Sequence, residues 1–152
     1  LKSYVPTDTQ FENAFSVATV SQAYLARFYL RELEAFADQS NVGESVVNPR
    51  VTAVNLEHVI PQVTSDAGWE GLDQDSCKDR CKRLGNLALM SSKEDARIGN
   101  DGWREKRKAL AGSSFELTKS IAKNENWGTT EVDERQKLLA SLAVKVWTTA
   151  FD

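Results

Sequence analysis

Four polar residues in the middle of the chain have the types and spacing that a hydrolytic site needs. Glu57 and His58 are neighbours in the stretch NLEHVIPQ, and His58 is the single histidine of the sequence. Asn86 follows a glycine in LGNLALM, and Asp95 comes nine residues later. A neutral imidazole can take a proton from water. Carboxylate oxygens bind Mg²⁺, which usually takes one or two of them and fills its other positions with water and phosphate.

This set of side chains suits the hydrolysis of a phosphodiester, which needs an activated water and neutralisation of charge on the phosphoryl oxygens. His58 is then the general base, Glu57 and Asp95 are metal ligands, and Asn86 braces a loop or orients the imidazole. Each residue also has a purely structural interpretation. His58 could be a packed histidine, Glu57 an exposed strand-end carboxylate, Asn86 a turn residue and Asp95 a first-turn helix acid.

Basic residues are concentrated around the same positions. The segment 78–108 carries ten basic and five acidic residues, a net charge of +5, whereas the whole chain carries −3. Charge acts locally, within a Debye length of about 8 Å at physiological salt, so a basic segment in an acidic body can bind phosphate groups. We expect Lys93, Arg97, Arg104 and Lys106 to contact DNA phosphates, and a solvated helical face is the alternative.

The elements expected to position these residues are mostly helices. Apolar residues at helical spacing, together with suitable capping residues, predict seven helices. The first runs from Thr7 or Asp8 to about Ala18, and the others cover 21–38, 76–84, 92–99, 102–110, 114–122 and 130–147. A loop is predicted at 39–50. The β-branched run at 51–60, ended by Pro61, predicts a strand with His58 near its end, and Leu87–Met90 predicts a second strand. If the strands pair antiparallel, the polar residues can meet. The expected fold class is mainly α with a small β-hairpin (α+β).

Further expectations concern packing. The apolar stripe of the second helix comprises Tyr24, Leu25, Phe28, Tyr29, Leu33 and Phe36, and that of the last helix comprises Leu138, Leu139, Leu142, Val146 and Trp147. Ser113 or Ser114 is the predicted cap of the helix that ends at Ala122. The four tryptophans, Trp69, Trp103, Trp127 and Trp147, are expected to pack in the core or at its edge.

The composition is that of an ordinary globular protein. The 152 residues are 41% hydrophobic and 27% charged, which suits one domain. No apolar run approaches the ~20 residues of a membrane span, and no signal-peptide pattern is present. Cys77 and Cys81 are too few for a structural zinc site and predict reduced thiols in a cytoplasmic protein. Because the chain begins at Leu1, we expect it to be part of a longer protein.

The motifs carry a resemblance to a known family. LEHVIPQ and LGNLALMSSKEDARIGNDGWREKRKAL resemble the HNH (ββα-metal) nuclease superfamily, and more narrowly the C-terminal nuclease domain of GmrSD-type modification-dependent restriction systems. The closing SSFELTKSIAKNENWGTTEVDERQKLLASLAVKVW is similar to the end of that domain. The resemblance covers roughly residues 20–150. It implies a single nuclease domain over 1–152, with a helical part at 7–40, a ββα-metal core at about 51–100 and C-terminal helices at 102–151.

The resemblance also implies roles for individual residues. His58 matches the general base, Glu57 a metal-binding acid and Asn86 the central asparagine of the motif. Asp95 matches the third motif position, which is usually Asn or His, so this chain departs from the pattern there. Lys106 matches a lysine that is typical of the segment after the motif helix, where a phosphate contact is expected.

The function that the resemblance implies is a metal-dependent DNA endonuclease that nicks DNA in bacterial defence against foreign or modified DNA. The implied cofactor is Mg²⁺, with Mn²⁺ as the second choice. The implied partners are double-stranded DNA, an N-terminal sensor or NTPase region outside this chain, and a second copy in a homodimer. Two other interpretations stay open. The chain could be a catalytically weakened helical module that binds DNA or protein, or a nuclease that cuts RNA in the manner of a toxin.

Overall fold

The computed structural model describes residues 5–38, 54–62, 69, 72–92 and 102–148. The elements in chain order are α1 (Asp8–Phe15), α2 (Ala23–Ala37), β1 (Val54–His58), α3 (Gln74–Cys81), the 3-10 helix η4 (Leu84–Asn86), β2 (Leu87–Ser91), α5 (Trp103–Ala111), α6 (Glu116–Ile121) and α7 (Thr129–Val146). The predicted class, mainly helical with a small hairpin, is confirmed. The predicted loop at 39–50 and most of the predicted helix at 92–99 lie outside the described residues.

β1 and β2 pair antiparallel, as predicted, although α3 and η4 lie between them in the chain. In the register of the pair, His58 lies opposite Leu87 and Glu57 lies opposite Ala88. Successive side chains of a strand point to opposite faces of the sheet. Glu57 and His58 therefore leave β1 on opposite faces, and this difference decides which helices each residue can reach.

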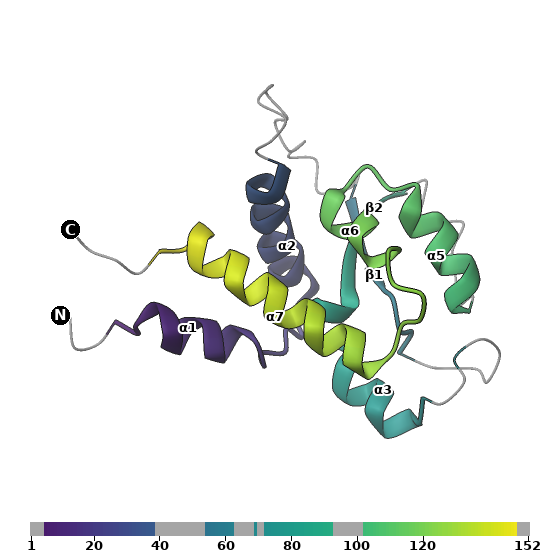
Figure 1. Cartoon of the computed structure of the whole chain (residues 1–152), viewed down its shortest axis with the longest axis horizontal. Helices are drawn as coiled ribbons and strands as arrows, with labels where there is room; N and C mark the ends of the chain where they lie inside the picture. The colour runs from purple at the N-terminus through teal and green to yellow at the C-terminus, as the bar shows by residue number, and fades with distance from the viewer. Residues whose placement is uncertain (1–4, 39–53, 63–68, 70–71, 93–101, 149–152) are drawn as a thin grey trace.

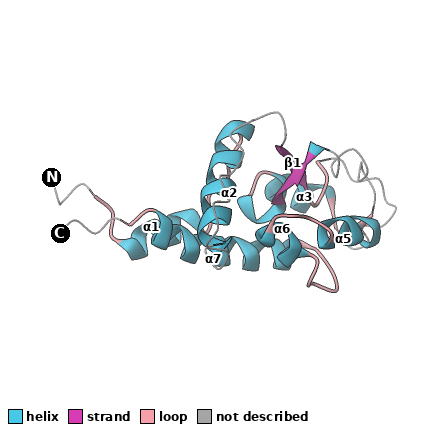
Figure 2. Cartoon of the chain, turned by 90° about the horizontal axis from the view of Figure 1, so that it is seen from above, coloured by secondary structure: helices cyan, strands magenta, loops and turns pink. Residues whose placement is uncertain are grey.

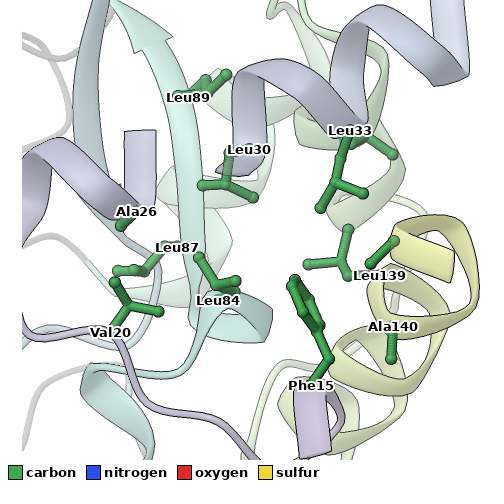
Figure 3. Packing of buried hydrophobic residues seen from close by; sticks show 12 residues of the cluster. Phe15, Val20, Ala26, Leu30, Leu33, Leu84, Leu87, Leu89, Leu139 and Ala140 are labelled. Carbon is green, nitrogen blue, oxygen red and sulfur yellow. The ribbon is translucent and has the colours of Figure 1, made fainter. Parts of the chain in front are cut away.

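One face of the hairpin, which carries Leu87 and Leu89, packs on α1, α2 and α7. Figure 3 shows side chains from all of these elements converging on one core. They include Phe15 of α1, Leu30 and Leu33 of α2, Leu84 of η4 and Leu139 of α7. Burial of each large aliphatic side chain stabilises the fold by about 1.5–3 kcal/mol, so this first core cluster fixes the hairpin to the long helices.

The opposite face of the hairpin, which carries Ala88 and Met90, contributes to a second core cluster with α5 and α6. Its aromatic part is a stacked pair, Trp103 and Trp127, with ring centres 5.7 Å apart and planes 26° apart. Trp69 is also buried in this cluster, and Trp147 packs against the first cluster. The predicted packing role of the four tryptophans is confirmed.

The helices are distributed along the long axis of the molecule, and α2 stands across it (Figure 1). Both views place α1 near one end of the molecule and α5 near the other (Figures 1 and 2). The long helix α7 connects these regions: it packs on α1 and α2, and it also contacts η4 and α3 (Figure 1). A single C-terminal helix therefore touches both the N-terminal helices and the segment that leads into β2.

The ends of α1 and α6 are capped in different ways. Thr7 caps α1, as predicted: its hydroxyl accepts from the Gln10 amide at 3.2 Å, and the Gln10 side chain accepts from the Thr7 amide at 2.9 Å. The predicted serine cap of α6 is wrong. The backbone amides of Glu116 and Leu117 donate instead to the carboxylate of Glu34 in α2, at 2.5 and 2.9 Å. This cap comes from a distant helix, so local sequence could not reveal it.

The predicted apolar stripe of α2 is partly wrong. Tyr24 is 64% exposed and Phe28 is 49% exposed, whereas Ala26, Leu30 and Leu33 are buried. The buried residues are spaced at i, i+4 and i+7, so they form one helical face. The prediction followed the aromatic side chains, but the core selects the face with smaller, aliphatic residues.

The predicted stripe of α7 needs a similar correction. Leu138 is 53% exposed, while its neighbour Leu139 is buried as predicted. The buried face of α7 also contains two polar residues, Arg135 and Gln136. A pattern of apolar residues does not predict buried polar side chains, and these two prove to hold the segment beside the candidate site.

Cys77 and Cys81 are both buried and both free, as predicted for reduced thiols. Among the helices of the described part of the chain, none combines the length and apolar character needed to cross a membrane.

Candidate active site

His58, the last residue of β1, is the centre of the candidate site. Its side chain is half-buried, and burial lowers the pKa of the imidazole. The positive charges of Lys106 and Lys82 lower this pKa further. The ring is therefore neutral at pH 7 and can accept a proton. Nε2 of the ring lies 3.2 Å from Nε2 of Gln62, and because an amide nitrogen only donates, the ring nitrogen accepts in this arrangement.

Asn86 holds the two residues that follow His58. Its side chain is fully buried, with Oδ1 accepting from the Ile60 amide at 2.8 Å and Nδ2 donating to the Ile60 carbonyl at 2.9 Å. The Asn86 carbonyl accepts from the Val59 amide at 2.9 Å. Trp127 also donates to Oδ1, at 3.5 Å. These bonds support the bracing role among the two roles expected for Asn86, because they fix the main chain and not the ring.

Lys106 holds β1 from the side of α5. Its ammonium donates to Glu57 Oε1 at 2.5 Å and to the His58 carbonyl at 2.7 Å, and its side chain is only 1% exposed. It also lies 6.0 Å from the ring centre of Trp69. A buried ammonium needs a charge partner to offset desolvation, and Glu57 supplies it. The expected DNA contact by Lys106 finds no support in this inward position.

Arg135 of α7 holds the 3-10 turn that ends at Asn86. One guanidinium nitrogen, Nη1, donates to the carbonyls of Leu84, Gly85 and Leu87 at 3.0, 2.8 and 2.8 Å. Complete burial lowers the pKa of Arg135 to about 10, which still leaves it charged at pH 7. A charged donor bound to three carbonyls makes a strong anchor. The turn that presents Asn86 is thus fixed from α7.

Gly85 and Gln136 form a second contact between α7 and the turn. The Gly85 amide donates to Gln136 Oε1 at 2.5 Å, and Gln136 Nε2 donates to the Phe15 carbonyl at 2.7 Å. A Cβ atom added at Gly85 would lie 2.2 Å from the carbonyl oxygen of Val132. Only glycine therefore lets the turn approach α7 this closely. Gln136 in turn ties α1 to the segment beside His58.

Among the remaining predicted site residues, only Arg104 lies in the described part of the chain. Arg104 is exposed on α5, and its DNA contact stays a prediction. Lys93, Asp95 and Arg97 lie outside the described residues, so their roles stay predictions as well.

The described residues do not by themselves fit a divalent metal ion. No three His, Cys, Asp or Glu side chains gather as metal ligands within the described part of the chain. The carboxylate of Glu57 is bonded to Lys106, and it leaves β1 on the face opposite to His58. Asp95, the second predicted ligand, is not among the described residues.

Besides Arg135 and Gln136 of α7, sequence reasoning missed three residues whose side chains act directly on His58 or Asn86. Gln62 contacts the imidazole, Trp127 bonds Asn86, and Lys82 acts on His58 through its charge. Gln62 carried a signal, because it lies four residues after the histidine in the same motif. Trp127 and Lys82 are distant in sequence from their partners, and nothing local distinguishes them from packing and surface residues.

The fold is a mainly helical domain in which the end of a two-stranded hairpin presents the half-buried histidine. Residues 5–142 match the family model for the C-terminal domain of GmrSD restriction endonucleases, and the chain belongs to this family. No curated protein and no solved structure matches the chain significantly. The match confirms the narrower part of the resemblance, and membership of the HNH superfamily stays a prediction.

Proposed function

We propose that this domain is a DNA endonuclease of a restriction system and that His58 is its general base. The family match supports a restriction-endonuclease role. The observation that carries the proposal is the half-buried imidazole at the end of β1, on a main chain held by Asn86 on one side and by Lys106 on the other. A base that is fixed in place and neutral at working pH is what proton transfer from water requires.

The proposed step is hydrolysis of one phosphodiester bond. His58 takes a proton from a water molecule as the water oxygen bonds to phosphorus. The bond from phosphorus to the 3′ oxygen breaks, and that oxygen takes a proton from solvent. The products are a 5′-phosphate and a 3′-hydroxyl. One site cuts one strand, so a nick is the expected product of a single event.

The proposal includes dependence on a divalent ion, with Mg²⁺ first and Mn²⁺ second. When bound, such an ion would neutralise charge on the phosphoryl oxygens. Glu57 and Asp95 are the proposed ligands, on the basis of the resemblance. Lys106 donates to Oε1 of Glu57, so the carboxylate would hold the ion through Oε2 or through an Oε1 shared with Lys106.

Nicking of supercoiled plasmid tests the proposal. The domain and its His58→Ala variant are incubated with plasmid in Mg²⁺, in Mn²⁺ and in excess chelator. We expect nicking by the unchanged protein in metal, and a rate at least about 100-fold lower for His58→Ala, because a positioned general base contributes that much or more. Leu138→Ala, at an exposed site on α7, is the matched control and should keep the full rate.

Two outcomes would count against the proposal. Equal nicking by the domain and by His58→Ala, with both folded by circular dichroism, removes His58 from the chemistry. DNA binding without nicking in any metal, both in this domain and in a longer protein that contains it, favours the alternative of a catalytically weakened binding module.

A further inference from the structure

The outward side of α2 carries two large aromatic side chains at the surface. Tyr24 is 64% exposed and Phe28 is 49% exposed, although side chains of this kind are mostly buried in folded proteins. Both rings are held in place. The Tyr24 hydroxyl donates to Oε1 of Gln22 at 2.7 Å. The ring centre of Phe28 lies 5.7 Å from that of Tyr29 and 6.3 Å from that of Trp147. The surface therefore presents two ordered rings to a ligand.

Two arginines lie beside these rings. Positions 24, 27, 28 and 31 follow helical spacing, so Arg27 and Arg31 share one side of α2 with the two aromatic residues. These four side chains, together with Glu32 and Val54, line a groove of about 270 Å³, which we call the α2 groove. Two guanidinium groups against one carboxylate give the groove a charge of +1, in a chain whose net charge is −3. Its chemistry suits an anion that also carries flat rings.

The α2 groove and His58 lie along the same side of β1. Side chains alternate across a strand, so Val54, Leu56 and His58 point to one face of the hairpin. That face packs on α2: Val54 and Leu56 contact the first core cluster, and Leu87, the register partner of His58, is buried in it. Val54 and His58 are the two ends of β1, about 13 Å apart at the usual rise of a strand. A nucleic-acid strand covers that distance in about four nucleotides.

We propose that the α2 groove binds unpaired nucleotides of the nucleic-acid substrate, a few positions away from the bond that His58 cleaves. This inference rests on the proposed function and names a substrate class, DNA with a single-stranded stretch beside the scissile bond. An exposed ring stacks on a base that is not paired inside a duplex, and such stacking tolerates every base. Guanidinium groups bind phosphate through paired N–H donors and also stack on flat rings. The face shared with His58 favours this occupant over a protein partner.

Binding of single-stranded DNA tests the ring contact. The probe is an end-labelled oligo-thymidine long enough to pass both the groove and His58, and binding is followed by fluorescence anisotropy. His58→Ala is the parent protein, in excess chelator, so that the DNA stays intact. We expect Tyr24→Leu, which keeps an apolar side chain but loses the ring, to weaken binding at least about fivefold, the lower end for one lost stacked base. Tyr24→Phe keeps the ring and should bind like the parent. A duplex of the same length should bind more weakly than the single strand.

The salt dependence of the same binding tests the arginine contact. Arg27→Gln should reduce the slope of log K against log salt by about 0.7, the value for one phosphate contact on a single strand. Lys137→Gln is the charge-matched control, since Lys137 is exposed on α7 and does not line the α2 groove. Leu138→Ala, at the neighbouring exposed position, controls for the loss of an apolar surface. Both controls should keep the affinity and the slope of the parent.

Thermal melts check that each variant stays folded. The inference is overturned if folded Tyr24→Leu and Arg27→Gln bind the single strand as the parent does, or if Lys137→Gln changes the slope equally. It is also overturned if the parent does not bind the single strand, which would leave a protein partner as the occupant. Nicking by the unchanged chain alongside any of these results would keep the proposed function and remove the groove contact. Weaker binding by both variants in a chain that never nicks would keep the groove contact and remove the proposed hydrolysis.

Discussion

At the residue scale, the single histidine gives the site its own spectroscopic probe. Burial, followed by the charges of Lys106 and Lys82, lowers the pKa of His58 below its ordinary value of 6.5. A base with a lowered pKa is deprotonated at pH 7 and loses its function as the pH falls through that pKa.

We therefore predict that an NMR titration of the one imidazole has a midpoint below 6.5, and that the nicking rate declines with the same midpoint as the solution is acidified. Lys82→Ala removes a positive charge and should raise the midpoint. Lys145→Ala, in the exposed last turn of α7, is the control and should leave the midpoint unchanged. A midpoint at or above 6.5 would show that the environment of the ring is not the one described.

The pair formed by Lys106 and Glu57 supports a second prediction at this scale. Removing one partner of a buried ion pair leaves an unpaired charge and costs about 3–5 kcal/mol. Lys106→Met should lower the free energy of unfolding by about that amount, measured by urea denaturation. Lys108→Met is the matched control on the same helix, because Lys108 is exposed and pairs with Glu105 at 3.0 Å.

The control should change stability by no more than about 1 kcal/mol, as surface pairs do. If both lysine variants unfold at the same urea concentration, the ion pair beneath β1 contributes nothing to the fold. Adding Glu57→Gln to Lys106→Met should recover part of the loss, because it removes the carboxylate that would otherwise be buried without a partner.

At the element scale, the approach of η4 to α7 is the feature with the tightest geometry. Gly85→Ala would force a methyl group to within 2.2 Å of the Val132 carbonyl oxygen. We predict a loss of about 1–3 kcal/mol, the usual cost of overpacking. Each lost kcal/mol lowers the melting temperature by about 2–4 °C in a domain of this size.

Gly112→Ala is the matched control, since the nearest atom to its added Cβ lies 3.6 Å away. Alanine there should be neutral, or stabilising by up to about 1 kcal/mol through the entropy of the unfolded chain. Similar melting temperatures for the two alanine variants would contradict the close approach. Slower nicking by a folded Gly85→Ala variant would show that the contact between η4 and α7 affects the activity of the site.

The elements themselves were largely predictable from local patterns. The β-branched run before Pro61 and the apolar run after Asn86 predicted both strands, and the Thr7 cap predicted the start of α1. Local sequence patterns did not predict the side-chain contacts between these elements. The Glu34 cap of α6 and the Arg135 anchor of η4 join residues more than forty positions apart, and buried polar residues interrupt the periodicity that reveals a helix face.

At the scale of the whole molecule, the sequence predicted the mainly helical class with one hairpin, and it predicted where His58 lies. It did not predict that the side chains of adjacent residues of β1 have different partners. Glu57 and His58 look like a functional pair in the sequence, yet the pleat of the strand sends their side chains to opposite faces. Because Glu57 and His58 are adjacent in the chain, the sequence suggested a shared role. In the structure the Glu57 carboxylate is bonded to Lys106, and the His58 ring contacts Gln62.

The dependence of η4 on α7 has a consequence for how the protein matures. Arg135 and Gln136 hold the turn that ends at Asn86 through hydrogen bonds, and both are synthesised about fifty residues after it. During translation, His58 emerges from the ribosome long before the helix that organises its surroundings. Incomplete chains would thus carry His58 and Asn86 without the helix that fixes their surroundings, and the proposed hydrolytic activity would arise only once α7 docks.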